Sequence, residues 1–378
     1  MDDLGVRPLD ERRRAAVHGP GAALRRPPDR GPPPDRQRSA HARPRPDVRP
    51  ADPRGHRIRR PHDPANRFHG DGRKQVSEGP APLRPVHYGV VPAGGLGTRF
   101  LPISRTVPKE LLPLVDTPVI ELVVSELASA GVDRVVIVIA PGKESLDAYF
   151  RPNERLEHRL AVEFRQQDID LLTRPEKLAN VRVVMQDEAK GNGHAVLQAR
   201  DLVGDEPFAM LWGDDIVLGD TPGVGQLISA RERLGGGSVV GCIRVPREKA
   251  SAYGVVAGTP VDERTQRVLA IVEKPKPEDA PSDLAAVHGY VLEPEVFEVL
   301  ERLPPGRNGE IWLTDAVTAM ARAGLPVWAV ELEGVRYDTG DKLGYVTAFV
   351  DAALARSDLG PLLAAHLRGR GWRSPGDR

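Results

Sequence analysis

The sequence has little cysteine and few aromatic residues: its 378 residues include one cysteine, Cys242, and 4% Phe, Trp and Tyr. A single cysteine cannot form an intrachain disulfide, so a fold held together by disulfides is excluded. Cys242 stands in the apolar run 238–243, which predicts a small buried residue rather than a nucleophile. A reduced compartment, the cytoplasm, is the location we expect.

Long apolar runs are also missing. No segment approaches the roughly 18 apolar residues that a membrane-spanning helix needs, so we expect no membrane partner. The three arginines at 12–14 precede a short mixed stretch that ends at Pro20, not an apolar segment. An export signal is therefore not expected.

The first 85 residues differ in composition from the rest. They hold 20 Lys and Arg against 11 Asp and Glu, and 16 of the 37 prolines. Such a segment, with almost no apolar periodicity, cannot bury enough surface to offset its ordering entropy. Residues 1–84 are therefore predicted to be a disordered extension. Basic tails can bind nucleic acid, but this one lacks interleaved aromatics and a fold, so we expect no nucleic-acid partner.

The most informative segment is a glycine-rich turn after a short apolar run. Residues 90–99 read Val-Val-Pro-Ala-Gly-Gly-Leu-Gly-Thr-Arg, and Pro-Lys-Glu-Leu-Leu-Pro follows at 108–113. Such glycines let backbone N–H groups approach a polyphosphate. The spacing excludes a Walker loop, and Pro102 and Pro108 exclude the helix that a dinucleotide fingerprint requires. A nucleotide-handling enzyme is therefore predicted.

From residue 86 onward, short strands alternate with helices. The first expected strands are 87–91, 134–140, 181–185 and 208–212, and the expected helices are 117–131 and 193–202. This rhythm predicts an α/β fold with a Rossmann-like, mostly parallel central sheet. Later strands crowd together, at 238–245, 253–257, 269–273 and 286–292. They predict an added mixed-sheet lobe for a second substrate.

Acidic residues stand where two expected strands end. Asp214 and Asp215 follow the strand at 208–212, and Asp338 follows one at 327–332. A carboxylate at the carboxyl end of a strand is well placed for Mg²⁺, which takes one or two carboxylates together with phosphate oxygens. Each acid alone would more often cap a loop or helix. Two such strand ends in a chain that also has a phosphate loop reverse this preference, so we expect a Mg²⁺ site here.

Five further strings complete the pattern. They are Gln-Asp-Glu-Ala-Lys-Gly-Asn-Gly-His at 186–194, Ala-Tyr-Gly-Val-Val at 252–256, Val-Glu-Lys-Pro-Lys at 272–276, Glu-Ile-Trp-Leu-Thr-Asp at 310–315 and Tyr-Asp-Thr-Gly-Asp-Lys-Leu-Gly-Tyr at 337–345. In order and spacing, residues 86–367 resemble the bacterial-type UTP:glucose-1-phosphate uridylyltransferases of the sugar nucleotidylyltransferase superfamily. The resemblance implies Mg²⁺-assisted, in-line transfer of uridylyl from UTP to glucose 1-phosphate, giving UDP-glucose and pyrophosphate without a covalent intermediate.

The resemblance also implies roles on the nucleotide side. Gln186 would read the pyrimidine edge, and Arg99 and Lys109 would neutralise the triphosphate and the departing pyrophosphate. The implied nucleotide-binding residues are Gly94, Gly95, Gly97, Thr98, Gln186 and Gly191. His194 is expected to help start the following helix rather than act as a base.

On the sugar side, Gly254 would let the backbone meet the hexose and Glu273 would accept its hydroxyls. Lys274 would bind the sugar phosphate and completes the implied catalytic set with Arg99 and Lys109. The resemblance implies that Asp214 and Asp338 hold the Mg²⁺.

The implied fold is the nucleotide-diphospho-sugar transferase type, divided into three segments. These are the extension at 1–84, a catalytic domain at 85–358, and a C-terminal helix and tail at 359–378. The sequence leaves open whether the chain forms a homo-oligomer.

Three positions depart from the family pattern. Asp341 stands where Asn is usual and adds negative charge beside the expected metal carboxylate. His288-Gly289-Tyr290 replaces Gly-Arg-Tyr and loses a cation on the sugar-phosphate side. Trp212-Gly213 replaces an apolar residue and proline. These departures bear on sugar preference rather than on the class of reaction.

Two other functions stay open at this point. A thymidylyltransferase for the same sugar phosphate shares the glycine turn and the Glu-Lys-Pro string. A catalytically silent sugar-nucleotide-binding regulatory subunit is the alternative from another class. The string at 186–194 favours uridylyl transfer, and the retained Arg99, Lys109 and Lys274 favour an active enzyme.

Overall fold

The computed structural model describes residues 82–371, without the side chain of Arg307. The predicted disorder of residues 1–84 lies outside the described residues, apart from the last three. The fold is built on a nine-stranded mixed sheet. In spatial order its strands are β5 (Asn180–Met185), β4 (Arg134–Ile139), β1 (Tyr88–Ala93), β6 (Phe208–Leu211), β11 (Leu284–Leu292), β8 (Ser238–Arg244), β12 (Val327–Glu331), β10 (Thr265–Glu273) and β9 (Gly254–Pro260).

The sheet has a parallel half and a mixed half. Strands β5, β4, β1 and β6 run parallel, whereas β11 runs antiparallel to both β6 and β8. At the far edge, β9 pairs with β10 and also returns to pair with β11, which closes the added lobe. The predicted fold class is confirmed, and the added lobe shares one hydrogen-bonded sheet with the central strands.

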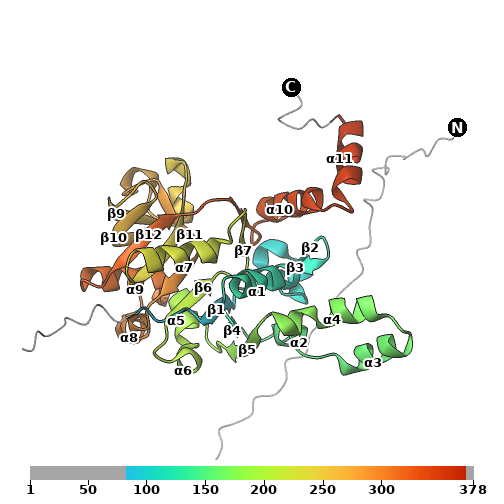
Figure 1. The fold of residues 1–378 in the computed structure, drawn as a ribbon. Helices are drawn as coiled ribbons and strands as arrows, with labels where there is room; N and C mark the ends of the chain where they lie inside the picture. The colour runs from blue at the N-terminus through green and yellow to red at the C-terminus, as the bar shows by residue number, and fades with distance from the viewer. Residues whose placement is uncertain (1–81, 372–378) are drawn as a thin grey trace, which may run out of the picture. The chain divides into compact units, whose positions relative to one another are not determined.

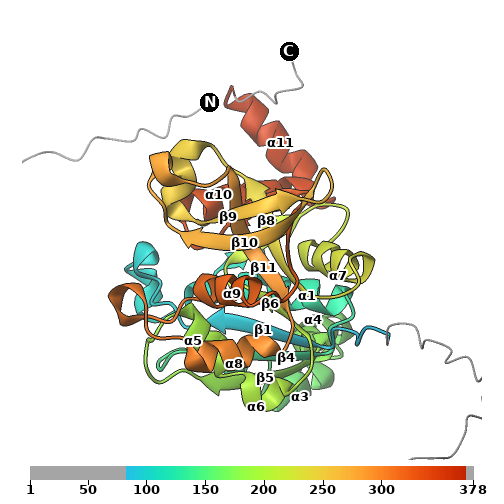
Figure 2. The same cartoon turned by 90° about the vertical axis from the view of Figure 1, so that its left-hand side faces the viewer.

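Helices cover both faces of the sheet (Figures 1 and 2). One face carries α1 (Val119–Ser129), α4 (Gln166–Leu178) and α7 (Gly223–Arg233), and the other carries α5 (Asn192–Leu197), α8 (Glu295–Arg302) and α9 (Leu313–Arg322). Alternate residues of a strand point to opposite faces. Accordingly, Val91 packs in the core under α1, whereas Val90 packs in the core under α5.

The helix expected at 193–202 is divided. After α5, the N–H of Ala199 bonds to the carbonyl of Val196, three residues back, and α6 (Arg200–Val203) follows this tighter turn. Two further helices, α2 (Ser145–Tyr149) and α3 (Glu154–Val162), follow β4.

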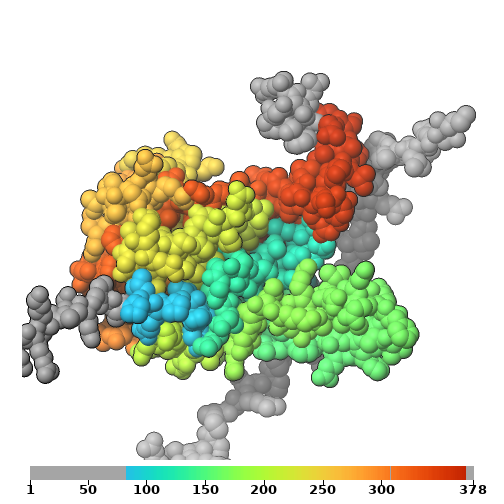
Figure 3. Space-filling view, viewed as in Figure 1, coloured from blue at the N-terminus to red at the C-terminus, as the bar shows by residue number. Residues whose placement is uncertain are grey.

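Two short antiparallel strand pairs and two C-terminal helices complete the strands and α-helices of the described residues. They are the antiparallel pairs β7 (Asp215–Leu218) with β13 (Val335–Asp338) and β2 (Pro113–Leu114) with β3 (Thr117–Pro118), and the helices α10 (Lys342–Ala355) and α11 (Gly360–Gly369). The Tyr345 hydroxyl on α10 donates to the Pro113 carbonyl at 2.7 Å. Figure 3 shows α10 and α11 in red against the teal segment that holds α1, β2 and β3.

Two expectations from composition can be checked within residues 82–371. Cys242 is completely buried, and burial raises the pKa of its thiol, as expected for a packing residue. No helix of this part of the chain is long and apolar enough to cross a bilayer.

Candidate active site

A pocket of 340 Å³ lies where the parallel strands end at their carboxyl edge. This is the edge at which ligands bind in open α/β sheets. Six predicted site residues line it: Gly94, Gly95, Lys109, Gln186, Gly191 and Asp214. A larger cavity of 570 Å³ borders α7 and the β9–β10 turn, but it contains none of the predicted residues.

Glycines shape the nucleotide side of the pocket. A Cβ on Gly94 would lie 3.1 Å from the side-chain oxygen of Gln186, and a Cβ on Gly191 would lie 2.6 Å from the Ile311 carbonyl. Gly191 also has φ +99°, a backbone conformation that favours glycine. The loops that contain Gly94 and Gly191 are far apart in the sequence, and these close approaches place their backbones around the same pocket.

The Gln186 amide is fixed within this space. Its nitrogen lies 3.1 Å from the Gly191 carbonyl and 2.9 Å from Nδ1 of His194, while its oxygen faces Gly94. His194 lies in the first turn of α5, as predicted, and contacts Gln186.

Lys109 reaches into the pocket from the turn at Lys109–Leu111 and forms an ion pair with Asp214. Burial lowers the pKa of Lys109, but the charges of Asp214 and Glu110 outweigh burial and raise the pKa overall. Lys109 therefore carries a full positive charge at neutral pH.

Glu110, the residue after Lys109, forms a buried ion pair with Lys143. Lys143 donates to both carboxylate oxygens of Glu110 at 2.9 Å and to the Ala93 carbonyl at 2.6 Å. Burial raises the pKa of Glu110 and lowers the pKa of Lys143, and each partner's charge opposes the shift of the other. The pair ties the end of β1, the lysine-bearing turn and the loop after β4 together.

The two carboxylates predicted to hold a metal both lie next to Gly340. A Cβ there would overlap the Asp214 carboxylate and lie 3.1 Å from Oδ1 of Asp338. The N–H and hydroxyl of Thr339 both donate to the Asp214 carbonyl, at 2.8 and 2.7 Å. Burial raises the pKa of Asp338; Arg336 lowers it, and the charge of Asp214 raises it further. Among residues 82–371 no cluster of three or more His, Cys, Asp or Glu gathers around a metal position.

The sugar-side residues are grouped beside the pocket. Glu273 pairs in register with Gly254 across β10 and β9, and it accepts a 3.1 Å hydrogen bond from Thr314. The Lys274 ammonium lies 4.9 Å from the ring centre of Trp312, which lines the pocket. Burial raises the pKa of Glu273.

Three predicted residues on the glycine turn do not line the pocket. Gly97 has φ +63° and is required for the turn itself, and Thr98 begins the short 3-10 turn that follows. Arg99 extends from that turn to the Gly340 carbonyl, with its Nη1 at 3.4 Å, next to the carboxylate pair.

Several residues of the site were given no role from the sequence. Trp212, Trp312 and Glu110 line the pocket, although all three stand inside or next to motif strings. Lys143 lies outside those strings, and nothing in the local sequence indicates its place in the site, because only the fold brings it to Glu110.

Two of the departures have structural explanations. The Asp341 carboxylate caps α10 by accepting from the N–H groups of Leu343 and Gly344, both at 3.1 Å. His288 is fully buried, and its Nε2 lies 2.7 Å from Oε1 of Glu126 on α1.

Comparisons with known proteins agree with this geometry. The family model for nucleotidyl transferases matches residues 88–354. A UTP–glucose-1-phosphate uridylyltransferase of Bacillus subtilis (strain 168) is 38% identical over 287 residues, covering 76% of this chain and 98% of that protein.

Solved structures show the same relationship. One, described as UDP-glucose pyrophosphorylase complexed with UDP-glucose, has a TM-score of 0.64 and 37% identity, covering 72% of this chain and all of that one. Another, a UTP-bound UGPase from Acinetobacter baumannii, has a TM-score of 0.67 and 34% identity. The match covers 75% of this chain and 99% of that one. The chain therefore belongs to the nucleotidyl transferase family and, within it, to the UTP–glucose-1-phosphate uridylyltransferases.

Proposed function

We propose that this chain transfers uridylyl from UTP to glucose 1-phosphate and releases UDP-glucose and pyrophosphate. The observation that carries the proposal is the single pocket in which the glycine turn, Lys109, Gln186 and Asp214 meet. The family membership supports the same reaction, since relatives with this name match over most of their length.

Gln186 suits a base-reading role. Its amide nitrogen is already engaged by Gly191 and His194, so its oxygen, facing the glycine turn, is the group available to accept a hydrogen bond. The N3–H of uracil is a matching donor. Base reading would then depend on a side chain that is ordered before UTP arrives, which lowers the entropy cost of binding.

The phosphate chemistry requires positioning and charge neutralisation. An oxygen of the sugar phosphate attacks the α-phosphorus of UTP, and the bond from that phosphorus to the pyrophosphate oxygen breaks. Both reactants are anions, so Lys109 and Arg99 on the nucleotide and Lys274 on the sugar phosphate offset their repulsion. The face of Trp312 favours the Lys274 ammonium at its observed position.

The carboxylate pair fits Mg²⁺. Burial and the Asp214 charge raise the pKa of Asp338, and a divalent cation would relieve that repulsion. Two carboxylates with room for water and phosphate oxygens form a donor set that Mg²⁺ prefers. Asp214 and Asp338 would hold the ion, and when bound it would orient the phosphates and neutralise their charge.

The reaction can be tested by measuring pyrophosphate release from glucose 1-phosphate with UTP, dTTP, ATP, CTP or GTP. We expect the highest kcat/KM with UTP. A preference for dTTP would support the thymidylyltransferase alternative, and no release with any nucleotide would support a silent binding subunit.

The metal assignment has its own test. Asp214→Asn and Asp338→Asn should each abolish Mg²⁺-dependent transfer while the fold is retained, as judged by circular dichroism. Asp220→Asn, an exposed acid after β7, is the control and should behave like wild type. Near-normal rates in both site variants at saturating Mg²⁺ would overturn the assignment.

We place the reaction in the cytoplasm, where nucleoside triphosphates and sugar phosphates are produced. Light scattering of the purified chain would decide between a monomer and a homo-oligomer, which the sequence leaves open.

A further inference from the structure

A buried ion pair connects the two strands that bear the metal carboxylates. Asp215, next to Asp214, stands opposite Asp338 in the β7–β13 register. The Arg336 guanidinium, two residues before Asp338, bonds the Asp215 carboxylate through Nε at 3.0 and 2.9 Å and through Nη2 at 2.5 Å. A planar guanidinium fork on a carboxylate fixes orientation as well as distance.

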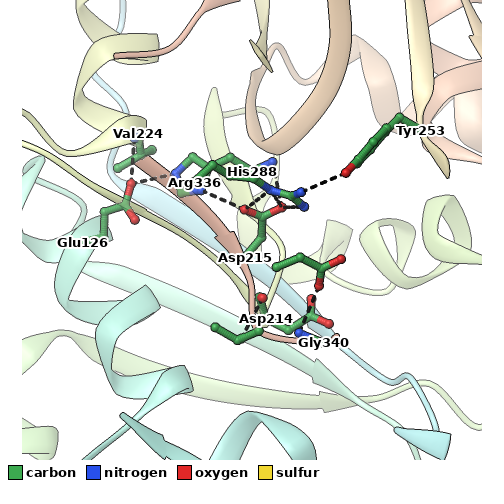
Figure 4. A network of polar contacts seen from close by, with 10 residues as sticks. Glu126, Asp214, Asp215, Val224, Tyr253, His288, Arg336 and Gly340 are labelled. Carbon is green, nitrogen blue, oxygen red and sulfur yellow. Dashed lines mark hydrogen bonds and ion pairs between the residues drawn. The ribbon is translucent and has the colours of Figure 1, made fainter. Parts of the chain in front are cut away.

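His288 extends this pair to the rest of the fold (Figure 4). Its Nε2 lies 2.7 Å from Oε1 of Glu126, and its backbone N–H donates to the Asp215 carboxylate at 3.2 Å. Its Nδ1 lies 3.8 Å from Asp215 and has no hydrogen-bond partner among residues 82–371. The imidazole therefore lies between two buried carboxylates.

The surrounding backbone accommodates His288 at three points. His288 has φ +62°, which is uncommon for a residue with a side chain and persists only where the surroundings enforce it. A Cβ on Gly289 would overlap the Met210 carbonyl, and a Cβ on Gly223 would lie 2.6 Å from the imidazole Nε2. The ring thus occupies space that the bare start of α7 leaves open.

The location of His288 in the sheet lets the cluster contact several separate elements. Strand β11 pairs with β9 at Ala285 and Ala286 and with β6 from Gly289 onward, so His288 stands where the strand changes neighbours. Glu126 also accepts a hydrogen bond from the N–H of Val224 at 2.8 Å. The cluster therefore joins α1, α7, β11, β7 and β13.

The charges alternate along the cluster. Burial lowers the pKa of His288, but Asp215 and Glu126 outweigh burial and raise it to about 9. Along the cluster the acidic side chains of Glu126 and Asp215 alternate with the basic side chains of His288 and Arg336. Each charge is compensated, as a buried ion requires.

We propose that His288 and Arg336 are positioning residues for the metal carboxylates: through Asp215 they hold β7 against β13 and thereby set the separation of Asp214 and Asp338. The inference rests on the proposed function, which places Mg²⁺ between those two side chains. In this chain the histidine that replaces a glycine of the family pattern links Glu126 to Asp215.

The test compares variants of the full chain. His288→Asn removes the imidazolium and keeps a residue type that tolerates positive φ. Arg336→Lys keeps the charge and loses the fork. Glu293→Gln is the matched control, because it weakens another buried ion pair, with Arg231 at 2.8 Å, away from the carboxylates. If His288→Asn fails to fold, Glu126→Gln is used in its place. The glutamine oxygen can still accept the hydrogen bond from the Val224 N–H, and the carboxylate charge that faces His288 is removed.

Two readouts are used. Mn²⁺ binding is measured by electron paramagnetic resonance without substrates, and the Mg²⁺ concentration for half-maximal UDP-glucose formation is measured separately. We expect His288→Asn and Arg336→Lys to weaken Mn²⁺ binding about tenfold and to raise the Mg²⁺ requirement by a similar factor, as loss of residues that orient metal ligands does. Glu293→Gln should lower the melting temperature and bind Mn²⁺ like wild type.

Wild-type Mn²⁺ affinity in both variants would overturn the inference, as would an equal loss in Glu293→Gln or a wild-type chain that binds no Mn²⁺. Failure of the proposed function would look different: the wild type would bind Mn²⁺ and form no UDP-glucose.

Discussion

Single side chains in the pocket are held in place by neighbours before any ligand binds. Gln186 is fixed by Gly191 and His194, and Lys109 by Asp214. Glu110 is fixed by Lys143 beneath the pocket floor. Preorganised groups of this kind act on charge without reorganising during the reaction.

The first residue-scale prediction concerns Gln186. Gln186→Ala removes the oxygen proposed to accept from uracil, which leaves a polar group of the base unpaired. We expect the KM for UTP to rise roughly tenfold, about 1.4 kcal/mol, while the KM for glucose 1-phosphate stays near wild type. Steady-state kinetics with each substrate varied in turn measures both. A loss confined to the sugar phosphate would contradict the role of Gln186.

The second concerns the Lys143–Glu110 pair. Lys143→Met leaves the Glu110 carboxylate buried without a partner, and we expect a loss of about 3–5 kcal/mol in the free energy of unfolding. Urea unfolding measures it. Arg151→Met breaks an ion pair of similar type with Asp147, in which half of the arginine side chain is exposed, and should cost less than about 1 kcal/mol. Equal losses in the two variants would show that burial of the pair is unimportant.

The third concerns pH. The folded pKa of His288, about 9, lies above the ordinary value near 6.5. The contribution of the protonated His288 to the free energy of unfolding is therefore fully present below pH 6.5 and is lost as pH rises through 9. Linkage gives roughly 3 kcal/mol over that interval. Urea unfolding at several pH values should show wild type losing more stability than His288→Asn over this range; parallel curves would contradict the prediction.

At the scale of elements, the site is assembled from the ends of secondary structures. The glycine turn follows β1, the carboxylates border β7 and β13, and α10 begins right after Gly340 and Asp341. A helix start exposes N–H groups that need acceptors. The Asp341 carboxylate oxygen meets that need at α10, so this departure from the family pattern serves as a helix cap next to the carboxylates proposed to hold Mg²⁺.

The prediction at this scale is a pair of variants. Asp341→Ala removes the cap and should cost about 1 kcal/mol of stability. Asp341→Asn keeps a good capping residue and removes the charge, so stability should stay within a few tenths of a kcal/mol of wild type. Thermal unfolding measures both. If the two variants lose the same stability, the charge rather than the cap is what matters.

At the scale of the whole molecule, one continuous sheet connects the two halves to which the nucleotide and the sugar are assigned in our proposal. Strand β11 pairs with β6 in the half proposed for the nucleotide and with β9 in the half proposed for the sugar. The site residues all lie after Tyr88, inside the segment that the family model matches.

The corresponding prediction is that residues 1–81 can be deleted without loss of activity. The cut should not go further, because the Arg84 carbonyl accepts from Arg231 at 2.9 Å and a Cβ on Gly236 would lie 2.9 Å from the Leu83 side chain. We expect deletion of 1–81 to change kcat/KM by less than about tenfold, 1.4 kcal/mol in the barrier, and deletion of 1–86 to lower the melting temperature. A strong loss of rate in the shorter deletion would show that the extension contributes to catalysis.

The sequence by itself determined the class of fold and the motifs of the site. An apolar run of strand length such as 135–139 can be recognised from the local sequence, because a strand buried on both faces needs a continuous apolar segment. The glycine turn can also be recognised from the local sequence, because only glycine permits its backbone conformations and close approaches.

Only the tertiary structure decided which groups pair at long range. Lys143 reaches Glu110, and His288 reaches Glu126, across 33 and 162 residues of chain. An ion pair of this kind leaves no local pattern, because its partners are joined by the packing of separate elements. The sequence showed that His288 departs from the family pattern, and the structure showed where its charge is compensated.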